Sequence, residues 1–191
     1  MFHFKLSTIL ASCVIACAPA LTLQAQSKET AIQCRLGEQC RVSNNIVFTP
    51  SIASSKSLEL FQVAADSKAL VVDLLFESEG IDPAMPYNVL LRFSGDPATS
   101  GTLLIIGTER IAPKNLATYS PNDGGSKVKV FPANGPHPLP RMYTNSDSVS
   151  WLVTGKGVLA IEFMLTPQQA SGQETLIVTV WDKEFRIPLH D

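Results

Sequence analysis

The sequence predicts an all-β protein, a single antiparallel β-sandwich of the immunoglobulin-like kind with about nine or ten strands. Two observations carry this prediction. Short segments of alternating apolar and polar residues recur from Ile46 to the end of the chain. Stretches rich in glycine, proline, asparagine and aspartate separate them, and these residues favour turns. Strands at this spacing are typical of two sheets packed face to face.

The first 25 residues have the layout of a secretory signal peptide. One positive charge, Lys5, precedes the apolar run LSTILASCVIACA, and polar residues follow the run. The run is too short and too interrupted to be a transmembrane helix. We expect cleavage after Ala25, which leaves a β-sandwich domain at 26–191. Cleavage after Ala20 is the alternative.

A bacterial lipoprotein signal is the competing interpretation. Cys13 and Cys17 each end a segment that resembles a lipoprotein cleavage box, in which the cysteine becomes the acylated first residue. Cys13 would leave a very short signal and an apolar stretch after the anchor, so Cys17 is the better candidate for lipidation. We prefer the simpler interpretation, in which both cysteines are small apolar residues of the signal's core.

Composition argues against several classes of function. The residues after Ala25 are enough for one domain with a sizeable core, and neither a composition shift nor an internal repeat marks a second domain. Loss of Lys5 leaves 14 basic and 17 acidic residues without a basic stripe. Nucleic acid or an anionic membrane would require such a stripe. We therefore expect no nucleic-acid partner and no transmembrane span in the mature chain.

The first feature of the mature chain is a cysteine pair, Cys34 and Cys40. Alternating residues flank both cysteines, and Gly37 lies at the centre of the five-residue link. This pattern predicts a hairpin that brings the cysteines to the distance a disulfide needs. An oxidising compartment favours that disulfide. A redox-active pair or a zinc site is the alternative, but the spacing is not Cys-x-x-Cys, and His137 and His190 are far away in sequence.

The strands follow along the chain. Residues 55–66 fit both a helix face and a strand face. The nearly all-apolar stretch at 102–108 predicts a central strand, and the alternating KVKV at 127–130 predicts a peripheral one. The other segments with strand patterns are 70–76, 87–93, 148–154, 158–165, 175–181 and 184–189.

Two hairpins close the chain in this prediction. Gly155-Lys156-Gly157 joins 148–154 to 158–165, and Asp182-Lys183 joins the last two strands. Pro188 cannot donate a ladder hydrogen bond, which indicates that the last strand lies at a sheet edge. An unpaired edge can accept a strand from another chain, and no other edge carries an obvious protecting residue.

No motif of known catalytic geometry is present, so we expect neither an enzyme nor a cofactor. Asp73 and Glu162 are each embedded in an apolar strand, which could indicate acid–base chemistry. Alternation places both on the face opposite the bulkier side chains, so we predict that they are exposed to solvent. The segment Asn145-Ser146-Asp147-Ser148 lacks the spaced acidic ligands of a calcium loop.

A proline-rich stretch at 132–140 is the other candidate site. His137 and Met142 are soft ligands that could hold copper, but together they make half a site, so we expect no metal. A stiff loop can instead contact a partner at low entropic cost, and the alternative is a plain connection between the sheets. The predicted contact residues are His137, Leu139, Arg141, Met142 and Tyr143.

These observations lead us to expect an exported, non-enzymatic protein-interaction module of the cell envelope or extracellular space. Its partners would be other envelope or extracellular proteins, met in assembly, surface structures or adhesion. This expectation rests on the predicted compartment and fold class, although β-sandwiches host many unrelated functions. Two alternatives stay open: an inhibitor or ligand-binding protein that uses the loop at 135–143, and an enzyme whose acidic residues meet only in three dimensions.

Overall fold

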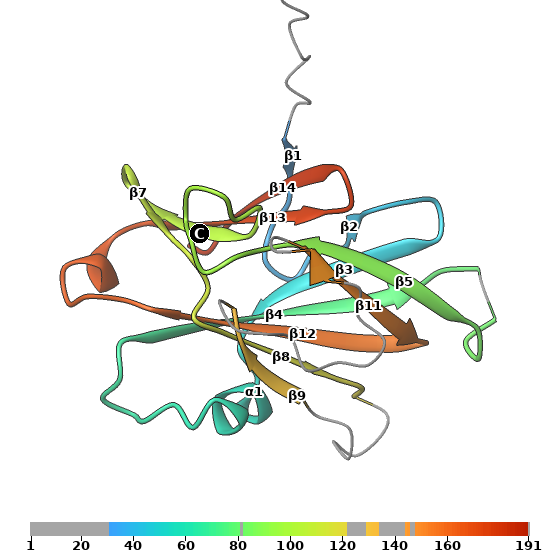
Figure 1. Ribbon diagram of the computed structural model, residues 1–191, viewed down its shortest axis with the longest axis horizontal. Helices are drawn as coiled ribbons and strands as arrows, with labels where there is room; N and C mark the ends of the chain where they lie inside the picture. Colours follow the sequence, from blue (N-terminus) through green and yellow to red (C-terminus); the bar gives the residue numbers. More distant parts are fainter. Residues whose placement is uncertain (1–30, 81, 122–128, 134–143, 146–147, 191) are drawn as a thin grey trace, which may run out of the picture.

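Two β-sheets packed face to face make up the protein in the computed structural model (Figure 1). The predicted all-β sandwich is confirmed. The described residues form fourteen strands, more than predicted, because several strands have only two or three residues. The structure describes residues 31–80, 82–121, 129–133, 144–145 and 148–190.

The larger sheet has eight strands, and every pair in it is antiparallel except β1 with β14. β6 (Leu103–Ile106) and β7 (Glu109–Ile111) extend it from β13. The main path runs through β1 (Ile32–Gln33), β14 (Lys183–Pro188), β13 (Glu174–Val180), β5 (Pro86–Arg92), β11 (Ser148–Thr154) and β10 (Thr144–Asn145).

The smaller sheet has six strands, all antiparallel. α1 (Ser55–Leu60) lies below it in Figure 1, so the segment with the ambiguous pattern is helical in its first half. A short 3-10 helix, η1 (Gln169–Ser171), precedes β13. The strand order is β2 (Cys40–Arg41), β3 (Ile46–Ile52), β4 (Ala69–Ser78), β12 (Lys156–Met164), β8 (Asn115–Tyr119) and β9 (Lys129–Pro132).

The peripheral strand predicted near residue 130 is confirmed as β9, at the edge of the smaller sheet. The apolar stretch at 102–108 forms β6, which pairs with β13 on one side and with the three-residue β7 on the other, so it has a neighbour on each side as predicted for a central strand. Leu103 is buried on the outer face, beside Ile177 of β13. Burial on both faces explains the apolar run.

Four aromatic rings hold the two sheets together. The ring of Phe48 lies 5.4 Å from that of Phe76 and 5.0 Å from that of Phe185. Trp151 meets Phe76 edge-on at 6.0 Å. Phe48 and Phe76 come from the smaller sheet, whereas Phe185 and Trp151 come from the larger one. Contacts of this kind each add about 0.5–1.5 kcal/mol beyond the burial of apolar area.

The predicted hairpin between β11 and β12 is wrong, because the two strands belong to different sheets. The link between them crosses the sandwich. Gly155 has a φ of +66°, and its carbonyl accepts a hydrogen bond of 3.1 Å from the Tyr87 hydroxyl. A Cβ on Gly157 would lie 2.7 Å from Cη2 of Trp151. The two glycines therefore let the chain turn and pass close to the indole ring.

The last predicted hairpin is confirmed, with Trp181 and Asp182 between β13 and β14. The Trp181 N–H donates to the Leu90 carbonyl at 2.7 Å, which joins this turn to β5. The prediction that the last strand lies at an edge is wrong, because β1 pairs with β14 at Phe185 and Arg186. β1 is an edge strand of only two residues.

Candidate functional site

The predicted disulfide between Cys34 and Cys40 is present, with a Cα–Cα distance of 6.0 Å, but the predicted hairpin around it is wrong. The Cys34 N–H donates to the Arg186 carbonyl at 2.9 Å, which continues β1 along the larger sheet. Cys40 lies in β2, opposite Phe48 in the smaller sheet. The bond therefore joins the edges of the two sheets. Alternation at both ends of the link could not distinguish one hairpin from two separate edge strands.

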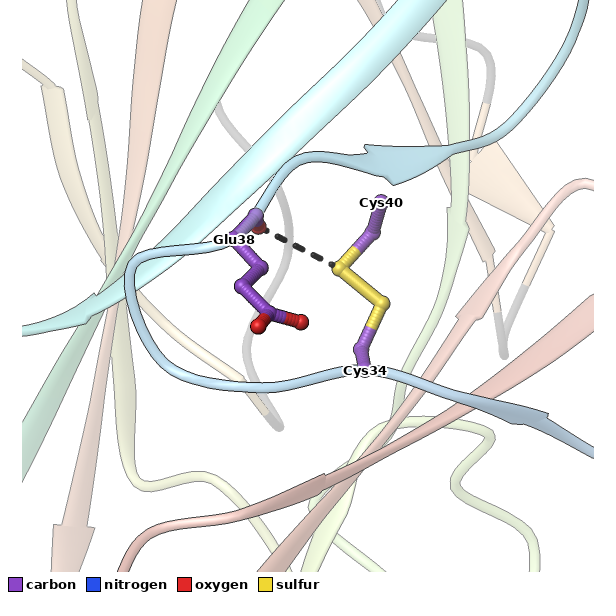
Figure 2. The surroundings of a disulfide bond; sticks show 3 residues. All are labelled: Cys34, Glu38 and Cys40. Carbon is purple, nitrogen blue, oxygen red and sulfur yellow. Dashed lines mark hydrogen bonds between the residues drawn. A yellow bond between two sulfur atoms is a disulfide. The ribbon is translucent and has the colours of Figure 1, made fainter.

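The surroundings of the disulfide are those of a structural bond. Cys34 and Cys40 are 6 % and 2 % exposed and belong to the main core. Figure 2 shows the link curving so that the Glu38 carbonyl oxygen comes within 3.6 Å of the Cys40 sulfur. The Lys183 ammonium group donates to the Val42 carbonyl at 2.6 Å and adds a second tie between the sheets. Thiol–disulfide exchange needs access to sulfur, which this burial restricts.

The prediction that Asp73 and Glu162 are exposed is wrong, since they are 4 % and 3 % exposed. Ala160 lies directly opposite Asp73, and Glu162 is two residues further along the same strand. The two carboxylates are thus diagonal neighbours on the outer face of the smaller sheet. A small apolar cluster between α1 and this face contributes to the burial, and alternation within a strand does not reveal such a cover.

Asp73 belongs to a polar cluster that attaches the start of α1 to the sheet. The Ser54 N–H donates to Asp73 Oδ2 at 3.0 Å. The hydroxyl oxygens of Ser54, Ser57 and Tyr119 lie 3.0–3.2 Å from one another. Three hydroxyl protons suffice for these three contacts, so the ring has no proton left for Asp73. Asp73 Oδ1 accordingly has no hydrogen-bond partner among the described residues.

Glu162 also has structural partners. The Asn115 side-chain amide donates to Glu162 Oε2 at 2.5 Å. Lys114 lies 3.9 Å from Glu162 Oε1, but its side chain is 53 % exposed, so solvent weakens this ion pair. General acid–base catalysis needs a group within hydrogen-bond reach of the substrate. The burial of both carboxylates therefore favours a structural role for them.

Several predicted site residues lie outside the described part of the chain and stay predictions. Within the described residues, no group of three or more His, Cys, Asp or Glu side chains could hold a metal ion. Nor does that part contain a helix long and apolar enough to cross a membrane. The residues outside it are the candidate lipidation site Cys17 and the candidate contact residues His137, Leu139, Arg141, Met142 and Tyr143.

Most sheet edges carry a feature that discourages pairing with another chain. Pro50 on β3 has no N–H, and its carbonyl accepts the Gly37 N–H at 2.8 Å. β9 contains Pro132, and β7 carries Glu109 and Arg110. β1, β2 and β10 are only two residues long. Proline, charge and shortness are the usual protections of a natural sheet edge.

The edge of β11 lacks these protections. β5 pairs with β11 along its whole length, but β10 pairs with it only at Ser148 and Val149. Residues 150–154 (SWLVT) therefore have no partner strand among the described residues on the side away from β5, and they contain neither proline nor a charge. The side chain of Leu152 in this window is 46 % exposed. We call residues 150–154 the open edge.

One hydrogen bond shows which backbone groups of the open edge point away from β5. The Leu90 carbonyl accepts from Trp181, so the backbone groups of Leu90 point away from β11. Leu90 and Ser150 are opposite each other, so their pair is not hydrogen-bonded and Ser150 points away from β5. Alternation gives Leu152 and Thr154 the same direction. The N–H and C=O groups of Ser150, Leu152 and Thr154 thus point away from β5, toward a side where the described residues provide no partner strand.

The open edge was missed in the sequence because the predicted hairpin placed β12 along it. Once β12 joins the other sheet, that side of β11 has no neighbour beyond β10 among the described residues. The signal was present in the letters SWLVT, a strand pattern without a charge or a proline. The identity of the neighbouring strand, which the sequence does not encode locally, decided the outcome.

No protein-family model matches the chain, and no curated protein matches it. Among solved structures, the chain is similar to an uncharacterized β-sandwich protein from Clostridium difficile 630. The TM-score is 0.40 with 8 % sequence identity, and the match covers 86 % of this chain and 98 % of the other.

Proposed function

We propose that this chain is an exported, non-enzymatic protein-interaction module of the cell envelope or extracellular space, which binds partners through the open edge of β11. The observation that carries the proposal is the window of residues 150–154, a strand without charge or proline whose side away from β5 has no partner strand in the part of the chain that the structure describes. An extended segment of a partner can add to such an edge as a further strand.

The open edge offers two kinds of contact. Backbone hydrogen bonds from Ser150, Leu152 and Thr154 would provide binding that depends little on the partner's sequence. The side chains of the same residues share the outer face of the larger sheet, where Ser150 donates to Asn88 at 2.6 Å and Leu152 is exposed. An apolar side chain beside Leu152 would bury surface worth about 25 cal/mol per Å².

Export is part of the same proposal, as is the immunoglobulin-like class of the sandwich. The layout of residues 1–25 and the buried disulfide support export, because disulfides persist in oxidising compartments. The intact mass of the protein from its native host tests this step. A chain that begins at Gln26 supports release after cleavage, and one that begins at an acylated Cys17 indicates a lipid anchor. A chain that still begins at Met1 would contradict export.

Site-specific photo-crosslinking tests the interaction in the native host. A photoreactive amino acid replaces Leu152 on the open edge and, as a matched control, Leu58 on α1, which is also an exposed leucine. We expect covalent complexes with envelope or extracellular proteins, or with a second copy, at position 152 and not at 58. No complex at 152, or the same complexes at both positions, would contradict the proposal.

A backbone variant separates strand addition from ordinary side-chain contact. Leu152→Pro removes an N–H that points away from β5, so it should preserve the fold while blocking the added strand. Leu152→Ala removes side-chain area and keeps that N–H. With a photoreactive residue at Thr154, we expect the proline variant to abolish crosslinking and the alanine variant to reduce it. Equal crosslinking in both variants would show that the partner does not add as a strand.

A further inference from the structure

We infer that the Cys34–Cys40 disulfide is a redox-sensitive latch for β1, whose opening frees β1 to leave the edge of the larger sheet while the sandwich stays folded. Cys34 directly follows β1, and Cys40 is the first residue of β2. These two short strands belong to different sheets. The effect of the bond therefore depends on how firmly each strand is held without it.

β2 is the firmly held end of the latch. It pairs with β3 at Cys40 and Arg41, and the Val42 N–H extends this pairing by donating to the Ile46 carbonyl at 2.9 Å. Val42 is fully buried. The two strands are close in sequence, so their pairing closes only a short loop at little cost in entropy. We expect β2 to stay on β3 without the disulfide.

β1 is the weakly held end of the latch. It pairs with β14 at two positions only, opposite Phe185 and Arg186 (Figure 1). The pairing is parallel, which is slightly less stable per residue than antiparallel pairing. Both side chains of β1 are exposed, so burial adds little, and Cys34 is the first buried residue at this end of the described chain.

The link between the cysteines explains why the bond matters for β1. The Gly37 N–H donates to the Pro50 carbonyl at 2.8 Å, which attaches the middle of the link to the smaller sheet. Between Cys34 and this attachment, Arg35 is exposed and Leu36 is only partly buried. With the bond intact, Cys34 stays within reach of Cys40, so β1 cannot move away from β14 while β2 remains paired. Without the bond, β1 can detach by itself and gain conformational freedom.

Detachment of β1 would uncover one side of β14. The Arg186 carbonyl accepts from the Cys34 N–H at 2.9 Å, so the backbone groups of Arg186 face β1. Alternation gives Glu184 the same direction and turns the backbone groups of Phe185 and Ile187 toward β13. In the described part of the chain, β14 would then become an edge strand of the larger sheet.

Opening the latch requires a dithiol reductant. The dithiol gives up two hydrogen atoms, the sulfur–sulfur bond breaks, Cys34 and Cys40 become thiols, and the dithiol closes into its own disulfide. Both cysteines are buried, whereas residues 37–39 of the link are exposed. The bond is therefore reduced slowly and stays closed in an oxidising compartment.

Residue-by-residue hydrogen exchange in the full chain tests the latch. The untreated protein is compared with the protein reduced by dithiothreitol and with the double variant Cys34→Ser and Cys40→Ser. The quantity measured is the exchange rate of the Arg186 amide relative to those of Phe185 and Ile187, because a general loss of stability raises all three together. We expect this ratio to rise at least about tenfold in both disulfide-free forms, since local opening of β1 then exposes Arg186 alone.

Lys183→Met is the matched control. It removes the hydrogen bond from the Lys183 ammonium group to the Val42 carbonyl, the second tie between the sheets, and keeps the disulfide. We expect the exchange ratio at Arg186 to stay unchanged in this variant. An unchanged ratio in the disulfide-free forms would overturn the latch, because β1 would be held by its own contacts. An equal rise in the Lys183→Met variant would also overturn it, because the effect would not be specific to the disulfide.

Discussion

At the scale of single residues, close contacts around the crossing between the sheets define what the core tolerates. A Cβ added at Gly157 would lie 2.7 Å from Cη2 of Trp151 and equally close to Cγ1 of Val153. The Trp151 ring is in turn held against Phe76 at 6.0 Å. A side chain at position 157 therefore has no space, and the Trp151 ring lies between Gly157 and Phe76.

Gly157→Ala should destabilise the fold by about 1–3 kcal/mol, because it overpacks a region that cannot easily yield. Urea unfolding measures the change. The double variant Gly157→Ala with Trp151→Leu supplies a matched test, since a smaller side chain makes room for the methyl group. We expect the two losses to be less than additive. Additive losses would show that the two residues do not compete for space.

Tyr87 provides a prediction about pH. Burial of its ring and, to a smaller degree, the negative charge of Glu77 raise the pKa of Tyr87 well above its ordinary value of 10.0. The unfolded chain therefore ionises first as the pH rises. The contribution of Tyr87 is fully present below its ordinary pKa, and the free energy of unfolding falls as the pH rises through that value.

Unfolding by urea at pH 8 to 11 measures this dependence. Other groups titrate in the same range, so Tyr87→Phe, which cannot ionise, is the control. We expect a shallower decline above pH 10 in the phenylalanine variant. Parallel declines in the two proteins would mean that the hydroxyl ionises as easily in the fold as in the unfolded chain.

At the scale of elements, α1 is stabilised by its cap and by what it covers. A six-residue helix is marginal on its own. Ser54 caps it by accepting the Ser57 N–H at 3.3 Å, and the Tyr119 hydroxyl closes the ring of three. Behind this cluster, Leu60 and Phe61 pack on the apolar outer face of the smaller sheet. The helix depends on the sheet beneath it.

Ser54→Ala should cost about 1 kcal/mol, the usual loss for an N-cap. Ser55→Ala in the first turn is the matched control, because Ser55 is exposed and does not cap the helix. Thermal unfolding gives the stability, and hydrogen exchange at residues 57–61 locates the effect. We expect faster exchange in that segment for the first variant only. The same small effect in both variants would show that the cap contributes little.

At the scale of the whole molecule, the disulfide joins the sheets where their edge strands meet. It closes a short link, so the constraint it puts on the unfolded chain is modest. Aromatic contacts between Phe48 and Phe185 bridge the sheets independently of it. The sandwich should therefore form without the covalent bond.

Replacing Cys34 and Cys40 together by serine should lower the free energy of unfolding by about 2 kcal/mol, as expected for a loop this short. Circular dichroism should still show a β-protein, and thermal unfolding should remain cooperative. Complete unfolding of the variant would mean that the disulfide is essential to the sandwich. Unchanged stability would mean that the bond does not form in the protein.

Local patterns predicted the strands, the last hairpin and the disulfide, because each depends on neighbouring residues. They failed where the outcome depends on residues far apart in sequence. The burial of Asp73 depends on its position beneath the start of α1, and the sheet to which β12 belongs depends on its pairing with β4 and β8. The open edge was missed for the same reason, because whether a strand lies at an edge depends on whether another strand pairs with its outer side.

The central claim is that the edge of β11 is open, and residue-by-residue hydrogen exchange in a dilute solution of the protein tests it most directly. The backbone groups of Trp151 and Val153 point toward β5, whereas those of Ser150, Leu152 and Thr154 point away. We predict slow exchange for the first two amides and fast exchange for the other three. Slow exchange at all five amides in dilute solution would show that the edge is already covered, and would contradict the account.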